Sequence, residues 1–124
     1  MKSSERIAEF RHAVDRLAEA LALSEGNPLG VDASIQRFEF CVELAWKSLR
    51  EVLQRDHGIE TASPKITLQE SYRVALISDE AAWLAMLRAH NLSSHTYRET
   101  LARGLYSRLP AYVGVLKRLA LTLE

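Results

Sequence analysis

The sequence contains almost no cysteine and no long apolar run. Of its 124 residues only Cys41 is a cysteine, which excludes an internal disulfide and argues against a zinc site built on cysteines. No segment approaches the ~20 apolar residues of a membrane span. The charged N-terminus, MKSSERIAEF, also lacks the continuous apolar core of a signal peptide. We therefore expect a cytoplasmic protein that makes no contact with a membrane.

The sequence also lacks the common signatures of nucleotide and metal sites. It has no glycine-rich phosphate loop, no HExxH motif and no acidic cluster suited to magnesium. It has no internal repeat, and its 48% apolar and 26% charged residues are ordinary for a folded protein. We therefore expect a single domain over residues 1–124 that holds neither a metal nor a cofactor.

The formal net charge is zero, but the charges are unevenly distributed. Residues 88–118 contain a single acid, Glu99, and a basic set consisting of Arg88, Arg98, Arg103, Arg108, Lys117 and Arg118. A basic C-terminal third could attract the phosphates of a nucleic acid. Because these positions step around a helix rather than forming one stripe, an ordinary solvated helix surface explains them equally well.

Apolar residues recur at spacings of three and four, which is the period of an amphipathic helix, and no run alternates as a strand would. The first such segment stops at SEGNPLG, and its apolar residues are Ile7, Phe10, Val14, Leu17 and Leu21. A second helix is predicted to begin near Asp32, a good N-cap residue, and to end at Gly58. Its apolar face consists of Ile35, Phe38, Val42, Ala45, Leu49 and Val52.

Two shorter helices are predicted to follow. The sequence Thr67-Leu-Gln-Glu70 has the pattern of a capping box, which predicts a third helix through about Ile77. Ser78 or Asp79 is expected to cap a fourth helix, whose buried residues would include Trp83, Met86 and Leu87.

Residues 91–94 are expected to interrupt the helical pattern. Thr96 and Glu99 then form a second capping box, which predicts a long last helix to the C-terminus. Pro110 lies inside that helix and should kink it. The overall prediction is all-α, an antiparallel up-and-down bundle of about five helices, resembling a four-helix bundle.

Several residues outside this interruption are expected to be structural. Trp46 and Trp83 are assigned to packing and Cys41 to filling the core, while His12 and His57 stand alone and are interpreted as structural. The second helix also carries four charged residues, which are expected to serve packing or partner contact: Arg37, Glu39, Glu43 and Lys47. Of these, Glu43 and Lys47 form an attractive i,i+4 pair.

Most candidate site residues lie in RAHNLSSHTYRE, residues 88–99. His95 is expected just before a helix N-terminus, where backbone donors and the helix dipole favour an anion such as phosphate. Histidine can move a proton near neutral pH, and Arg88 could hold phosphate or stabilise a charged transition state. Composition and spacing by themselves favour a capped connection between helices over an active site.

Two longer motifs resemble a known family. IQRFEFCVELAWKSL, residues 35–49, followed by WLAMLRAHNLSSHTY, residues 83–97, is similar to the nucleotidyltransferase substrate-binding proteins, a HepT-like branch of the HEPN superfamily. The similar pattern spans nearly the whole chain. The resemblance implies an all-helical homodimer or higher homo-oligomer. It also implies a partner, a small and separately encoded nucleotidyltransferase, in a two-component, toxin–antitoxin-like system.

The resemblance also implies site residues. In the superfamily, an arginine followed after four to six residues by histidine marks a metal-independent ribonuclease site, and a tyrosine beyond it is the proposed acceptor of AMP. His95, Tyr97 and Asn91 carry over directly. The arginine expected directly before the asparagine is His90 here, and Arg88 restores the longer permitted spacing from a different angle of the helix.

Three functions follow from these residues. The first is a substrate-binding and partner subunit of the nucleotidyltransferase, which His90 in place of arginine favours. The second is a ribonuclease that cleaves RNA with Arg88 and His95 as catalytic residues and is silenced by nucleotidylation of Tyr97. The third is a homodimeric helical protein with no such chemistry. Whether the chain is an enzyme stays open at this point.

Overall fold

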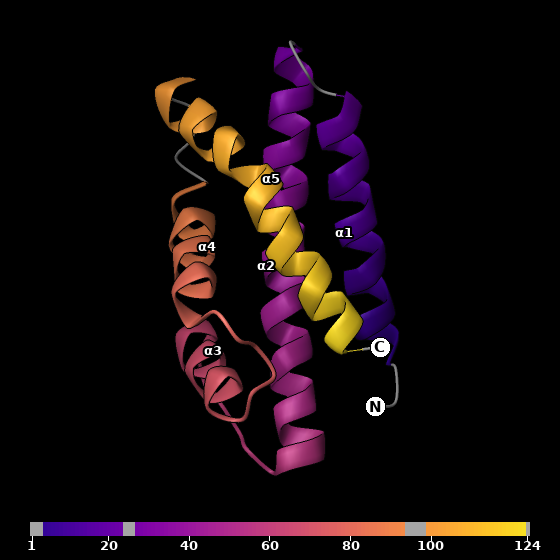
Figure 1. Ribbon diagram of the computed structural model, residues 1–124, viewed down its shortest axis with the longest axis vertical. Coiled ribbons are helices and arrows are strands. Elements are labelled where there is room, and N and C mark those ends of the chain that lie inside the picture. The colour runs from indigo at the N-terminus through magenta and orange to yellow at the C-terminus, as the bar shows by residue number, and fades with distance from the viewer. Residues whose placement is uncertain (1–3, 24–26, 94–98, 124) are drawn as a thin grey trace.

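The computed structural model describes residues 4–23, 27–93 and 99–123, and over these residues it consists of helices and their connections. The helices are α1 (Glu5–Leu23), α2 (Pro28–His57), α3 (Pro64–Arg73), α4 (Glu80–Ser93) and α5 (Glu99–Thr122). Figure 1 shows α1 and α2 side by side, α5 crossing over them, and α3 and α4 following one another along the other side of α2. The predicted all-α bundle with long first, second and last helices is confirmed.

The helix α2 is the centre of the bundle. It is 30 residues long and contacts each of the other four helices. Its fully buried side chains include Phe38, Ala45 and Leu49, and the Phe38 ring stacks on Tyr112 of α5 with 5.6 Å between ring centroids. Burial of each large side chain of this kind contributes about 1.5–3 kcal/mol. The apolar spacing therefore predicted the buried face of α2 correctly.

The start of α2 differs from the prediction. The helix begins at Pro28, and its N-cap is Asn27, whose Oδ1 accepts a hydrogen bond from the Leu29 backbone N–H at 3.0 Å. Proline is well suited to the first helical position because its fixed φ is already helical and its missing N–H is not needed there. The predicted cap, Asp32, is wrong and lies inside the helix. The predicted end is correct, with Gly58 in the left-handed conformation at φ 66°.

The helix α3 is also displaced from its predicted position. It begins at Pro64 with Ser63 as N-cap, and the Ser63 Oγ accepts from the Ile66 N–H at 3.3 Å. Thr67 does not cap, because its side chain is buried and donates to the Ser63 carbonyl at 2.7 Å. The helix ends at Arg73, before the predicted Ile77.

The two ends of helix α4 test the predicted N-cap and the predicted interruption after the helix. Asp79, rather than Ser78, caps it, since the Asp79 Oδ1 accepts from the Ala82 N–H at 3.0 Å. The helix continues through Ser93, so the predicted start of the interruption at Asn91 is wrong, and Ser94 lies outside the described residues. The predicted cap at Thr96 lies outside the described residues. The helix α5 continues through Pro110, which is exposed.

Among the described residues, none of the helices combines the length and the apolarity that crossing a membrane requires.

Candidate functional site

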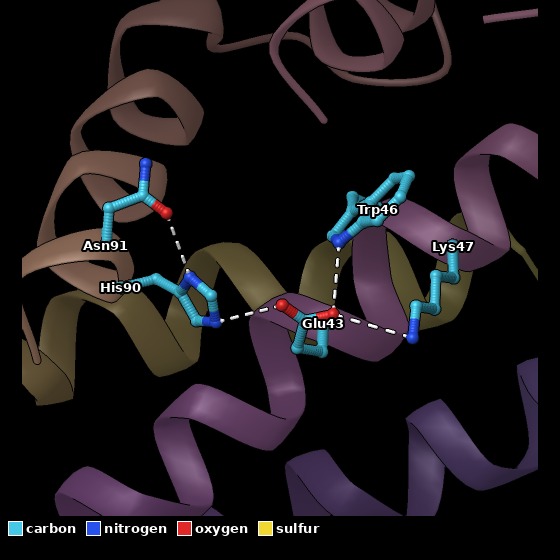
Figure 2. A network of polar contacts seen from close by, with 5 residues as sticks. All are labelled: Glu43, Trp46, Lys47, His90 and Asn91. Carbon is cyan, nitrogen blue, oxygen red and sulfur yellow. Dashed lines mark hydrogen bonds and ion pairs between the residues drawn. The ribbon is translucent and has the colours of Figure 1, made fainter. Parts of the chain in front are cut away.

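A network of polar contacts joins α2 to α4 around the carboxylate of Glu43 (Figure 2). One carboxylate oxygen, Oε1, lies 3.2 Å from His90 Nε2 on α4. The other, Oε2, accepts a hydrogen bond from the Trp46 indole N–H at 3.3 Å and lies 3.6 Å from the Lys47 ammonium. Both oxygens of one carboxylate are therefore engaged, one across the helix interface and one within α2.

The helical period explains why these side chains meet. Glu43, Trp46 and Lys47 stand at i, i+3 and i+4, so they share one face of α2. On α4, Met86 and Leu87 are buried against the core. His90 follows them by four and three residues, which turns its side chain toward α2. Packing of the two apolar faces thus brings an imidazole against a carboxylate.

His90 has an oxygen facing each of its ring nitrogens. In addition to the Glu43 contact of Nε2, Nδ1 lies 3.2 Å from the Asn91 side-chain oxygen. A protonated imidazole carries two N–H donors and satisfies both contacts, whereas the neutral ring can donate to only one of them. The His90 side chain is 18% exposed and that of Glu43 is 40% exposed. The pair is therefore reachable from solvent but held in place.

Arg88 lies on a different side of α4 from His90. Arg88 and His90 are two positions apart, which separates them by about 200° around the helix axis. Arg88 is exposed on the same face as Ala81 and Leu92. Within one copy of the chain, the guanidinium and the imidazole therefore do not face a common cleft. Asn91 is exposed beside His90, and the remaining candidates, His95 and Tyr97, lie outside the described residues.

The comparisons with known proteins match the chain to one family. Residues 5–124 match the family described as "Nucleotidyltransferase substrate binding protein like". The chain belongs to this family. The resemblance inferred from the two sequence motifs is thereby confirmed.

One curated relative is similar to this chain over part of its length. A Haemophilus influenzae protein named "Probable ribonuclease HepT" is 32% identical over 87 residues, which cover 67% of this chain and 60% of that protein. The chain thus matches less than two thirds of the length of that curated relative.

Two solved structures have the same fold over almost their full length. A Thermus thermophilus protein superposes with a TM-score of 0.87 at 35% identity, covering 93% of this chain and 98% of that one. A Haemophilus influenzae protein superposes with a TM-score of 0.86 at 25% identity, covering 94% and 98%. Its structure is described as revealing "the fold of a substrate binding domain of a nucleotidyltransferase".

Glu43, for which packing or partner contact was predicted, was not predicted to lie in one site with His90. Its attractive pairing with Lys47 was predicted and is present, but its contact with His90 has no local signal because the two residues lie on different helices. Trp46, which was assigned to packing, is half-buried, and the Arg50 guanidinium lies over its ring, 4.9 Å from the centroid. Trp83 is 4% exposed, in agreement with a packing role.

Metal ligands and a reactive thiol are two further kinds of chemistry that a site could use. The described residues contain no group of three or more histidine, cysteine, aspartate or glutamate residues placed to hold a metal ion. Cys41 is fully buried, and burial raises the pKa of its thiol to about 12 although the charge of Arg37 acts in the opposite direction. The thiol therefore stays protonated at neutral pH and is not a nucleophile.

Proposed function

We propose that the chain is the substrate-binding and partner subunit of a small nucleotidyltransferase, in a cytoplasmic two-component system of the toxin–antitoxin kind. The observation that carries this proposal is the contact between Glu43 and His90. His90 occupies the place where the ribonuclease pattern has an arginine. The carboxylate that faces it repels a phosphate group, and its contacts among the described residues are with an imidazole, an indole and an ammonium rather than a guanidinium. The site is therefore better suited to contact with a protein than to cleavage of RNA.

The proposed partner contact can be tested by co-purification. The chain carries an affinity tag and is co-expressed with a small nucleotidyltransferase from the same genome. We expect the two proteins to elute together, and we expect Glu43→Ala and His90→Ala each to weaken the complex by about tenfold, which corresponds to about 1.4 kcal/mol. The control is Glu70→Ala, which removes a carboxylate from another exposed ion pair, with Arg73 on α3. If each small nucleotidyltransferase of that genome eluted separately from the chain at micromolar concentration, the proposal would be wrong.

We also propose that two copies of the chain associate. Two large apolar side chains, Leu92 of α4 and Leu101 of α5, are 62% and 48% exposed on adjoining ends of their helices. Large exposed apolar side chains are candidates for an association surface. Light scattering is expected to report a particle of twice the 14.0 kDa chain mass. A particle of the chain mass alone at tens of micromolar would contradict this proposal.

A metal-independent ribonuclease is the second candidate, which the name of the Haemophilus influenzae relative favours. In this alternative Arg88 would stabilise charge on the scissile phosphate, while His95 would activate the ribose 2′-hydroxyl or protonate the leaving oxygen. The partner would silence the activity by nucleotidylating Tyr97.

The test of this candidate is incubation of the purified chain with bulk tRNA in the absence of metal, beside His95→Ala and Arg88→Ala. Cleavage that both variants abolish would establish the ribonuclease. If the tRNA stays intact in every sample, the ribonuclease is excluded and the partner-subunit function is the one that remains. Cleavage that His90→Ala abolishes, and that falls as pH rises through the imidazole range, would show that a protonated His90 has taken the place of the arginine.

A further inference from the structure

A groove of about 450 Å³ lies between α1 and α2, and the described residues that line it all belong to these two helices. Its polar lining consists of His12 and Arg16 from α1 and of Gln36 and Arg37 from α2. The rest is apolar, and the largest apolar side chain is Phe40 of α2. None of these residues belongs to the network around Glu43 and His90, so the groove is a separate feature of the molecule.

The described residues of the lining include cationic donors and no carboxylate. Within residues 4–23, 27–93 and 99–123, no side-chain hydrogen bond or ion pair engages His12, Arg16 or Arg37, whereas Arg55 and Arg73 both pair with carboxylates. Two guanidiniums that line one groove, and that are not paired with any described residue, attract an anion, and a guanidinium is matched in shape to phosphate.

Phe40 adds an aromatic surface beside these cations. Its side chain is 58% exposed, and it follows Arg37 by three residues and Gln36 by four, so each of these two side chains neighbours the Phe40 ring on α2. An exposed aromatic ring next to guanidiniums is the combination by which proteins hold a nucleobase and its phosphate.

We propose that this groove binds a nucleotide, with the base stacked on Phe40 and the phosphate held by Arg16 and Arg37. His12 and Gln36 supply further hydrogen-bonding groups in the lining. The volume lies within the range of small-ligand sites, about 300–1,000 Å³. The nucleotide is either free or one unit of a single-stranded RNA, since both present the same base and phosphate.

A second copy of the chain is a less suitable occupant. A two-fold interface pairs the same surface patch with itself, so an interface centred on this groove would bring Arg16 and Arg37 of one copy against the same cations of the other. Like charges in such a position oppose association. An anionic ligand meets no such repulsion.

The test is fluorescence anisotropy at low salt with two probes, a fluorescent ATP analogue and a fluorescein-labelled RNA hexamer. We expect Arg16→Gln/Arg37→Gln to weaken binding at least tenfold and to flatten its dependence on salt, because fewer phosphate contacts remain. Phe40→Leu is expected to weaken binding several-fold with the salt dependence unchanged, because stacking is not ionic. Tighter binding of the hexamer than of the ATP analogue identifies RNA as the source, and the reverse identifies a free nucleotide.

Matched controls are available on α3. Lys65→Gln/Arg73→Gln removes the same charge from exposed positions, and Tyr72→Leu removes an aromatic ring that is 48% exposed. Both are expected to change affinity less than twofold. Circular dichroism verifies that each variant folds. Chemical-shift changes in the wild-type chain on addition of the ATP analogue, concentrated at residues 12–16 and 33–44, test the site without any substitution.

Three results would overturn the proposal. One is the absence of binding of either probe up to millimolar concentration. Another is an equal loss of affinity in the α3 controls, which would indicate attraction by charge alone. The third is a change of particle mass in the groove variants with probe binding unaltered, which would make the groove a contact between proteins. None of these results would bear on the nucleotidyltransferase complex, because that complex is tested through Glu43 and His90.

Discussion

The backbone of Ala75, just after α3, provides a direct test of how this helix ends. Ala75 has φ 64°, the left-handed region, and it is the sole non-glycine residue with positive φ in the described part of the chain. The conformation lets the Leu76 N–H donate to the Ser71 carbonyl at 2.9 Å and the Ala75 N–H donate to the Tyr72 carbonyl at 3.1 Å. These bonds close the helix in the manner of a left-handed C-terminal cap. For a residue with a Cβ the conformation costs about 1–2 kcal/mol.

Ala75→Gly removes the Cβ that causes this strain. Ala75 is exposed, so the substitution removes little packing. Glycine loses more conformational entropy on folding, which offsets about 0.4–1 kcal/mol of the gain. The net expectation is a rise of about 0.5–1 kcal/mol in the free energy of unfolding. For a chain of this length this corresponds to a melting temperature higher by about 2–5 °C. Urea unfolding followed by circular dichroism measures the first quantity, and calorimetry measures the second.

The matched control is Ala111→Gly on α5. Ala111 is exposed and helical, so the same substitution there should lower the free energy of unfolding by about 0.5–1 kcal/mol. The two substitutions are thus expected to have opposite signs. Equal destabilisation by both would show that Ala75 bears no strain in solution and would refute the reasoning.

Three further outcomes are expected. The Ser48 hydroxyl on α2 is fully buried and has no hydrogen-bond partner among the described atoms, so Ser48→Ala should raise the free energy of unfolding by about 1 kcal/mol. A lower urea midpoint would show that the hydroxyl is satisfied. Burial raises the Cys41 pKa from 9.0 to about 12. The Cys41 thiol therefore ionises at a lower pH in the unfolded chain than in the folded chain, and stability is lost as pH rises from 9 toward 12. At pH 10 the loss should be about 1.4 kcal/mol relative to pH 8, and urea unfolding of Cys41→Ala should not show it. A double-mutant cycle of Glu43→Gln and His90→Gln should give a coupling of about 0.2–1 kcal/mol, because both side chains remain in contact with solvent, and zero coupling would contradict the contact.

The buried faces of the helices could be predicted from the sequence because each depends on local spacing alone. The residues predicted to face the core on the first helix, such as Ile7, Phe10 and Val14, are fully or almost fully buried. The apolar residues of one face bury together once the helix forms, whatever the details of its neighbours. Periodicity therefore predicts which side of a helix is inside.

The helix starts were less predictable because proline serves two purposes. Pro28 lies in SEGNPLG, where the first helical pattern was predicted to stop, yet it is the first residue of α2, and Pro64 likewise opens α3. A proline ends a preceding helix and also favours the first position of the next. Asp32 and Thr67 are equally acceptable caps by composition, so the sequence alone did not distinguish them from Asn27 and Ser63.

One side of the candidate site could be predicted from the sequence, and the other side could not. The resemblance directed attention to His90, since this residue replaces an expected arginine, but the carboxylate that faces it comes from another helix. No local pattern relates Glu43 to His90, because their contact depends on how α2 packs against α4. Arg88 illustrates the same limit. Its spacing from His95 fitted the superfamily pattern, yet the helix turns it away from His90.

Two surfaces of opposite charge now lie along α2. Glu43 presents a carboxylate toward α4, while Arg37, six residues and about 9 Å earlier along the axis, lines the cationic groove toward α1. A phosphate is attracted by the second and repelled by the first, so one anionic ligand does not satisfy both. The two surfaces should therefore serve different ligands, a nucleotide in the groove and a donor group of a partner protein at Glu43. If so, Glu43→Ala should weaken the nucleotidyltransferase complex and leave probe binding unchanged, and Arg16→Gln/Arg37→Gln should do the reverse. Loss of both activities in each variant would mean that α2 carries one continuous site.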